Sequence, residues 1–246
     1  MRRSPPPAPA SAIPGPSVSA AAPDAAAAEK AERRCAWPRF SSLIRDDLEQ
    51  IAALRKLPLD AVYDTWLCGF LTSAVVDGHR SFILREDNFA QARRFDGLPF
   101  VQSDGRTVKA KNLSGSEGHF IGLHWLGPRR HPVLIVEGAV ALMEGHAAAE
   151  AAQAASGPSG WAVLAATSAY SRIDDALLAD LAGRHVRIVP DADKAGHRAV
   201  ANWTAALRAA GAVVDAFALP PGIKDLGPLV ANPFTHRETL RRIFTL

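Results

Sequence analysis

Two short apolar runs, each ending in an acidic residue and a turn, constrain the fold of this chain more than any other feature. The first run, Val133–Val136, leads into Glu137 and Gly138. The second run, Val186–Val189, leads into the segment Pro190–Gly196, which carries an Asp-x-Asp pair. Short runs rich in β-branched residues, separated by an alanine-rich stretch of helical character, are typical of neighbouring parallel strands in an α/β protein.

Carboxylates follow both of these strands at the point where each strand ends. Parallel strands end at one edge of a sheet, where open α/β sheets bind ligands, so Glu137, Asp191 and Asp193 should converge there. Carboxylates held together repel one another unless a cation lies among them. Because the set contains no cysteine or histidine, the pattern favours a hard ion, Mg²⁺ or Mn²⁺.

The second half of the chain has a regular alternation of strands and helices. Ser171 is positioned to cap the helix that follows it, and Gly211 stands where a helix C-terminal glycine belongs. The spacing of Thr235 and Glu238 predicts a capping box and a short terminal helix. The expected strands are 133–136, 161–166, 185–190 and 213–218, and the expected helices are 139–154, 172–182 and 194–210.

The first half has a different composition. Large apolar residues on both sides of Pro58 predict two amphipathic helices. Between residues 80 and 126, short apolar segments, including one at 120–123, predict antiparallel strands joined by turns. The expected organisation is a disordered Pro/Ala-rich leader over 1–36, a small α+β subdomain over 37–130, an α/β domain over 131–232 and a C-terminal helix over 233–246.

Composition excludes several classes of protein. Two cysteines are too few for a disulfide framework or a zinc ribbon and favour a reduced, cytoplasmic location. No apolar run approaches the roughly 20 residues that a spanning helix needs, so no membrane contact is expected. A net charge of +3 by itself says little about partners.

The same segments carry a family resemblance. The pair Glu137–Gly138, the segment Asp191–Gly196 and the segment Gly222–Leu226 resemble the Toprim domain of DnaG-type primases and of related plasmid and phage primases. Upstream, Gln91–Gly97 and Lys109–Leu113 resemble the segment that precedes Toprim in these enzymes. The resemblance covers roughly residues 40 to 230 and implies a Toprim-type, Rossmann-like parallel sheet flanked by helices, preceded by a small α+β subdomain.

The resemblance also implies roles for single residues. Glu137 would act near the reacting phosphate, as a metal ligand or as a proton acceptor for a 3′-hydroxyl. Asp191 and Asp193 would hold divalent metal, and Asp225 matches a further acidic position. These residues form the predicted catalytic set (Glu137, Asp191 and Asp193) and metal set (the same three with Asp225). The implied activity is synthesis of short primers on single-stranded DNA from nucleoside triphosphates, with a replicative helicase as a further partner.

The upstream segment supplies the predicted nucleic-acid contacts. Between residues 80 and 130, nine basic residues stand against five acidic ones, which favours phosphate contact over a solvated face. Neither His119 nor His124 is assigned a role, because histidines in an apolar context are usually structural. The predicted nucleic-acid-binding residues are Arg93, Arg94, Lys109, Lys111 and Asn112.

Departures from the family pattern leave other functions open. Many primases carry an aspartate four residues beyond the glutamate, where this chain has Ala141. A catalytically decayed Toprim module that binds nucleic acid in a mobile-element replication complex is one alternative, and a Toprim nuclease or topoisomerase is another. A haloacid-dehalogenase-like phosphatase also opens with Asp-x-Asp, but there the motif begins the domain, whereas Asp191 follows two earlier strands. The sequence contains no Walker A pattern, so it predicts no helicase activity.

Overall fold

The computed structural model describes residues 25–127, 131–156 and 160–246. Most of the predicted leader therefore lies outside the described residues. Its last part was predicted wrongly to lack structure, because Ala25–Cys35 forms helix α1. This helix buries none of its residues, but Arg34 donates hydrogen bonds to the carbonyl of Gly115 and the carboxylate of Glu117. These contacts explain how a helix with few large apolar side chains attaches to the rest of the chain.

The first half is a small α+β unit, as predicted. Helices α2 (Arg45–Arg55) and α3 (Leu59–Leu67) lie on either side of the break at Pro58. A four-stranded antiparallel sheet of order β1-β2-β3-β6 follows, with a separate β4–β5 pair. The strands are β1 (Leu71–Val76), β2 (His79–Glu86), β3 (Phe89–Arg94), β4 (Phe100–Val101), β5 (Thr107–Val108) and β6 (Lys111–Asn112).

The second half contains the predicted parallel sheet. Its order is β11-β10-β8-β9-β7, with β8, β9, β10 and β11 parallel. Strand β7 (Phe120–Ile121) was expected among the antiparallel strands of the first half, but it runs antiparallel to β9 at the edge of this sheet instead. The parallel strands are β8 (Val133–Glu137), β9 (Ala162–Ala166), β10 (His185–Val189) and β11 (Val213–Ala216).

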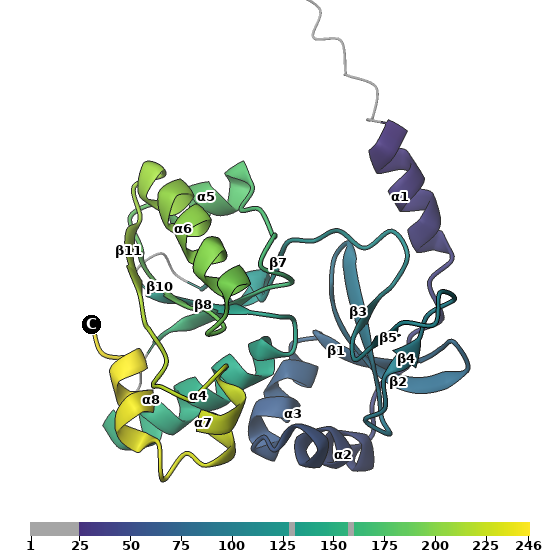
Figure 1. Cartoon of the computed structure of the whole chain (residues 1–246), viewed down its shortest axis with the longest axis horizontal. Coiled ribbons are helices and arrows are strands. Elements are labelled where there is room, and N and C mark those ends of the chain that lie inside the picture. The colour runs from purple at the N-terminus through teal and green to yellow at the C-terminus, as the bar shows by residue number, and fades with distance from the viewer. Residues whose placement is uncertain (1–24, 128–130, 157–159) are drawn as a thin grey trace, which may run out of the picture.

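Helices cover both faces of the parallel sheet (Figure 1). Helices α5 (Asp175–Leu181) and α6 (Lys194–Ala209) lie on one face, and α4 (Ala141–Ser156) lies on the other with α7 (Gly227–Ala231) and α8 (Arg237–Ile243). Helix α6 turns an apolar stripe to the sheet, which buries Trp203 and Leu207. The fold class is therefore α/β with a parallel sheet flanked by helices, as the sequence predicted.

Two helix starts differ from the sequence prediction. Asp174, and not Ser171, caps α5, because its side chain accepts a hydrogen bond from the amide of Leu177. The Ser171 hydroxyl bonds with the side chain of Thr167 instead. Helix α8 begins after His236 without a side-chain cap, so the capping box expected at Thr235 does not form.

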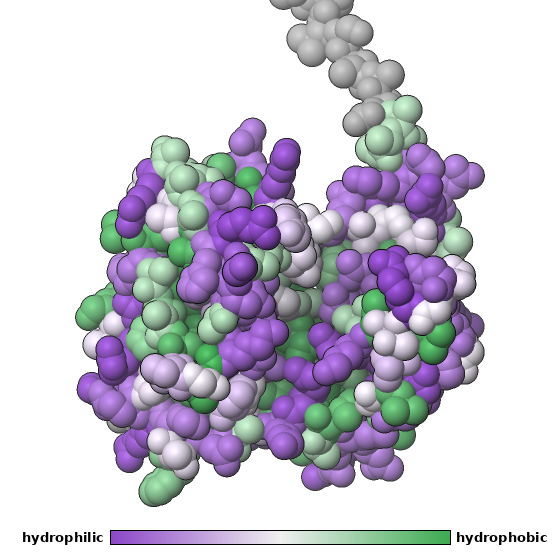
Figure 2. Space-filling model, in the orientation of Figure 1, coloured by the Kyte–Doolittle hydropathy of each residue, from purple (hydrophilic) through white to green (hydrophobic). Residues whose placement is uncertain are grey.

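The two halves share one apolar core. Leu48, Ile51 and Val62 from the first half belong to the same buried cluster as Leu142 and Met143 of α4. Hydrophilic residues cover most of the face shown in Figure 2, which is notched at the top between the two halves. The shared core fixes the small unit against α4.

Candidate active site

The order in which the chain adds strands to the parallel sheet reverses between β8 and β10. The chain passes from β8 through α4 to β9 on one side, and then crosses to β10 on the other side of β8. Ligands of open α/β sheets bind at such a switch point, beyond the carboxyl ends of the strands. Glu137 is the last residue of β8, and Asp191 and Asp193 lie in the loop after β10. The structure therefore brings the three predicted carboxylates to one edge, which we call the acidic edge.

Helix α6 approaches this edge closely at Gly196. A Cβ atom at this position would lie 2.2 Å from the carbonyl oxygen of Asp191 and 3.0 Å from Glu137 Oε2. Asp193 caps the same helix, since its Oδ1 accepts hydrogen bonds from the amides of Ala195 at 2.9 Å and Gly196 at 3.0 Å. The absence of a side chain at residue 196 thus allows the Asp-x-Asp loop to pack against the end of β8.

The three carboxylates differ in their affinity for a proton. Partial burial raises the pKa of Glu137, and the charge of Asp193 adds to the effect. Burial, followed by the charges of Glu137 and Asp225, raises the pKa of Asp191 to about 7. Asp193 has a lowered pKa, chiefly because the amide of Gly196 donates to its carboxylate. The edge thus combines one firmly ionised carboxylate with two that retain protons more readily.

A second loop, residues 220–226, closes one side of the acidic edge. Its Lys224 carbonyl accepts a hydrogen bond of 2.7 Å from the amide of Ala192. The Lys224 Nζ lies 4.0 Å from Asp191 Oδ2 and 3.8 Å from Asp193 Oδ2. Asp225 accepts a hydrogen bond from the amide of Gly227 at the start of α7, and its charge acts on Asp191. Asp225 thus lies beside the acidic edge.

A buried acid on α4 was missed by the sequence analysis. The Glu144 side chain is 5% exposed and pairs with Arg55 of α2 at 2.8 Å. Burial raises the pKa of Glu144, while the charge of Arg55 opposes that effect. Asp225 and Arg93 also act electrostatically on Glu144. An acidic residue next to Leu142 and Met143 in an apolar helix was the only available signal, because its partner is 89 residues away.

The donor set of the acidic edge fits a hard divalent ion. Within the described residues, Glu137 Oε2 is buried and has no hydrogen-bond partner. The oxygen donors that Glu137, Asp191, Asp193 and Asp225 offer are carboxylates, which suit Mg²⁺ or Mn²⁺, and Mg²⁺ usually needs only one or two of them beside water and phosphate. Asp191 and Asp193 would hold such an ion, with Glu137 and Asp225 beside them.

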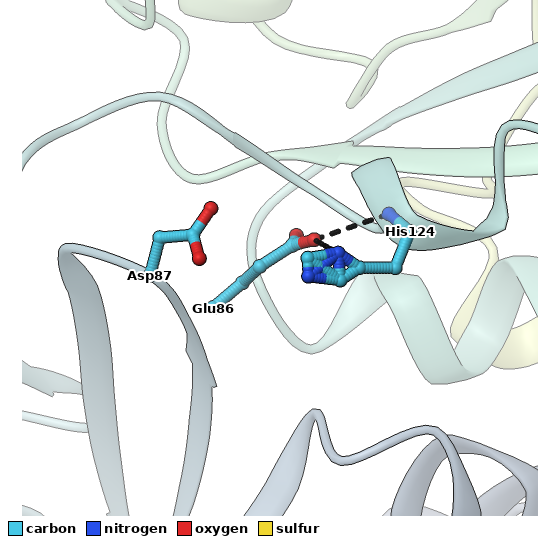
Figure 3. Close-up of side chains that lie close together, drawn as sticks. All are labelled: Glu86, Asp87 and His124. Carbon is cyan, nitrogen blue, oxygen red and sulfur yellow. Dashed lines mark hydrogen bonds and ion pairs between the residues drawn. The ribbon is translucent and has the colours of Figure 1, made fainter.

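A tighter group of potential ligands lies elsewhere. Among the described residues, Glu86, Asp87 and His124 place one ligand atom each within 4.8 Å of one another (Figure 3). The Glu86 carboxylate, however, accepts hydrogen bonds from the amides of Gly122, Leu123 and His124, at 2.6, 3.2 and 3.2 Å. These bonds occupy both of its oxygens in holding the turn after β7. We therefore assign Glu86 a structural role.

The predicted nucleic-acid-binding residues fall into two groups. Arg93, Arg94 and Lys109 line one cavity of about 200 Å³ together with Arg55, and we call this the cationic pocket. Burial, together with the nearby charge of Arg55, lowers the pKa of Arg93 to about 10. Within the described part of the chain, the buried Nε of Arg93 has no hydrogen-bond partner.

The other predicted contacts already have partners within the protein. Lys111 Nζ pairs with Asp77 Oδ2 at 2.5 Å. The Asn112 side chain accepts a hydrogen bond of 2.9 Å from Gln91. Arg94, although it lines the cationic pocket, is paired with Asp96. Arg93 and Lys109 are therefore the better candidates for an anionic ligand.

The fold and this edge define an α/β protein with an acidic cluster at the switch point of a parallel sheet and a cationic pocket in the unit that precedes it. No protein-family model and no curated protein matches the chain. The chain is similar to the crystal structure of the Aquifex aeolicus primase (zinc-binding and RNA polymerase domains), at 16% identity and a TM-score of 0.45, over 83% of this chain and 49% of that one. A DNA primase domain from Pseudomonas aeruginosa is similar at 16% identity and a TM-score of 0.38, over 82% of this chain and 63% of that one.

The chain thus spans about half the length of the first of these proteins and less than two thirds of the length of the second. In the described ranges, no helix combines the length and the apolar character that crossing a membrane requires.

Proposed function

We propose that the chain is a Toprim primase-like nucleotidyltransferase that synthesises short primers on single-stranded DNA by metal-dependent phosphoryl transfer. The observation that carries this proposal is the convergence of Glu137, Asp191 and Asp193 at the switch point. The order of these acids along the chain, followed by Lys224 and Asp225, is the one that resembles the Toprim domain.

Each part of the site has a role in such a reaction. A divalent ion held by Asp191 and Asp193 would neutralise charge on the transferred phosphoryl group. Glu137 Oε2 has no partner among the described residues and belongs to a carboxyl of raised pKa, so it is suited to accept the proton of a 3′-hydroxyl. Arg93 and Lys109 supply positive charge for the phosphates of the template strand.

Primer synthesis on single-stranded templates tests this proposal. The parent should incorporate labelled ribo- or deoxynucleotides with Mg²⁺ or Mn²⁺, and Glu137→Gln should lower the rate by about 100-fold or more, because it removes a charge and a proton acceptor at constant size. Binding of single-stranded DNA should stay near that of the parent.

A matched variant tests whether the activity depends on the acidic edge or on the group formed by Glu86, Asp87 and His124. Asp87→Asn makes the same carboxylate-to-amide change at an exposed member of that group and should leave primer synthesis unchanged. Loss of activity in Asp87→Asn with retention in Glu137→Gln would refute the assignment. A parent that binds single-stranded DNA but incorporates no nucleotide with either metal would favour the non-catalytic binding module, which the alanine at 141 already suggests.

A further inference from the structure

The Lys224 ammonium lies beside the carboxylates of both Asp191 and Asp193. It lies within 4.0 Å of a carboxylate oxygen from each residue, and in both residues this oxygen is Oδ2. The other oxygen of Asp193, Oδ1, is already engaged by the amides at the start of α6. An ion that bridges the two residues must therefore approach the oxygens that Lys224 now neutralises.

The backbone of Lys224 is fixed, but its side chain is free to move. The carbonyl of Lys224 accepts the 2.7 Å hydrogen bond from Ala192, which ties its loop to the Asp-x-Asp loop. The Lys224 side chain is 65% exposed, and distances of 3.8 and 4.0 Å are longer than charge-assisted hydrogen bonds. A lysine has a flexible four-carbon stem, so its ammonium can leave the edge without any change in the loop.

We propose that Lys224 is an exchangeable counterion of the acidic edge, which balances the carboxylates in the metal-free protein and is displaced when a divalent ion binds. This inference rests on the proposed function only in taking Asp191 and Asp193 as the metal ligands. An ammonium and a divalent cation repel each other strongly at about 4 Å, so the two do not share the edge. The free protein therefore binds a divalent ion more weakly than its carboxylates alone would allow.

Titration calorimetry with Mn²⁺ alone tests the proposal on the full chain. Lys224→Met removes the competing charge and should tighten Mn²⁺ binding roughly five- to tenfold. The matched control is Lys194→Met, which removes an exposed ammonium from the residue next to Asp193. No ion pair of Lys194 occurs in the described residues, and its removal should change the affinity less than about twofold because exposed charges are screened.

Asp191→Asn in the same titration distinguishes failure of the inference from failure of the proposed function. The inference is supported if Asp191→Asn binds Mn²⁺ more weakly than the parent and Lys224→Met binds it more tightly, while Lys194→Met binds it like the parent. If Asp191→Asn weakens binding but Lys224→Met binds like the parent or less tightly, the metal site stands and the exchangeable counterion is refuted. Equal tightening by both lysine variants also refutes it. If Asp191→Asn binds Mn²⁺ like the parent, the metal site itself is wrong.

Discussion

Replacing Gly196 with alanine should disturb the acidic edge directly, because the new methyl group has no room. Its Cβ would lie 2.2 Å from the carbonyl oxygen of Asp191, whereas ordinary van der Waals contacts begin at about 3.4 Å. The start of α6 and the Asp-x-Asp loop must therefore separate by about 1 Å. Overpacking of this kind costs about 1–3 kcal/mol. The better helix propensity of alanine offsets about 1 kcal/mol of this cost, which leaves a net loss of up to about 2 kcal/mol.

Thermal unfolding with and without Mn²⁺ measures how Gly196→Ala changes both the stability of the protein and its binding of metal. A net loss of up to about 2 kcal/mol lowers the Tm by up to about 8 °C for a chain of this size. Mn²⁺ at 100 times its Kd should stabilise the parent by about 2.7 kcal/mol. We expect this increment to fall to near zero in Gly196→Ala, because its metal ligands are displaced.

The matched control is Gly145→Ala in α4, another helical glycine that faces the sheet. Its Cβ would meet Val163 Cγ1 at 2.5 Å, a side-chain atom of strand β9, which carries none of the acids of the acidic edge. Gly145→Ala should lower the Tm modestly and keep the full Mn²⁺ increment. A Gly196→Ala protein with the Tm and the Mn²⁺ increment of the parent would refute the argument that close approach of α6 builds the site.

Two further predictions concern the cationic pocket and the contact between α3 and α4. Arg93→Ala combined with Lys109→Ala should weaken single-stranded DNA binding and flatten its salt dependence, measured by fluorescence anisotropy, because fewer counterions are released. Lys111→Ala, which loses a residue already paired with Asp77, should do neither, and equal salt slopes for all three proteins would place the DNA elsewhere. Burial, together with Asp64 and Asp60, raises the pKa of Glu150 to about 7. The native state therefore binds more protons than the unfolded state between about pH 4.5 and 7, so Glu150 makes stability fall as pH rises through that range. Glu150→Gln should remove on the order of 1 kcal/mol of this fall, after allowance for solvent screening of a half-buried carboxyl, and identical Tm–pH curves for variant and parent would contradict the prediction.

The sequence predicted the parallel sheet because each of its core strands is visible as a separate apolar run. Strands β8 and β10 are buried along almost their whole length, and apart from Glu137, His185 and Arg187 they consist of β-branched and aliphatic residues. The acids at their ends could be placed because parallel strands share an edge. Strand β7 was assigned to the wrong sheet because a two-residue strand carries no pattern that identifies its partner.

Other features depend on contacts between distant parts of the chain. The ion pair between Arg55 and Glu144 joins two residues that lie 89 positions apart, and no sequence pattern near either residue indicates it. The position of Lys224 over the Asp-x-Asp loop likewise depends on the hydrogen bond between two loops. The sequence showed which acids meet at the sheet edge, but not which cations lie near them.

Glu144 links the acidic edge and the cationic pocket electrostatically. Its carboxylate interacts with Arg55 and Arg93 on the side of the pocket and with Asp225 on the side of the acidic edge. Glu144 and Asp96 together cannot neutralise the four cations that line the pocket, and Lys224 cannot neutralise the three acids of the edge. The two regions therefore keep opposite net charges next to each other. A divalent ion together with the phosphates of a nucleotide and a DNA strand presents the same two charges side by side, as the proposed reaction would require.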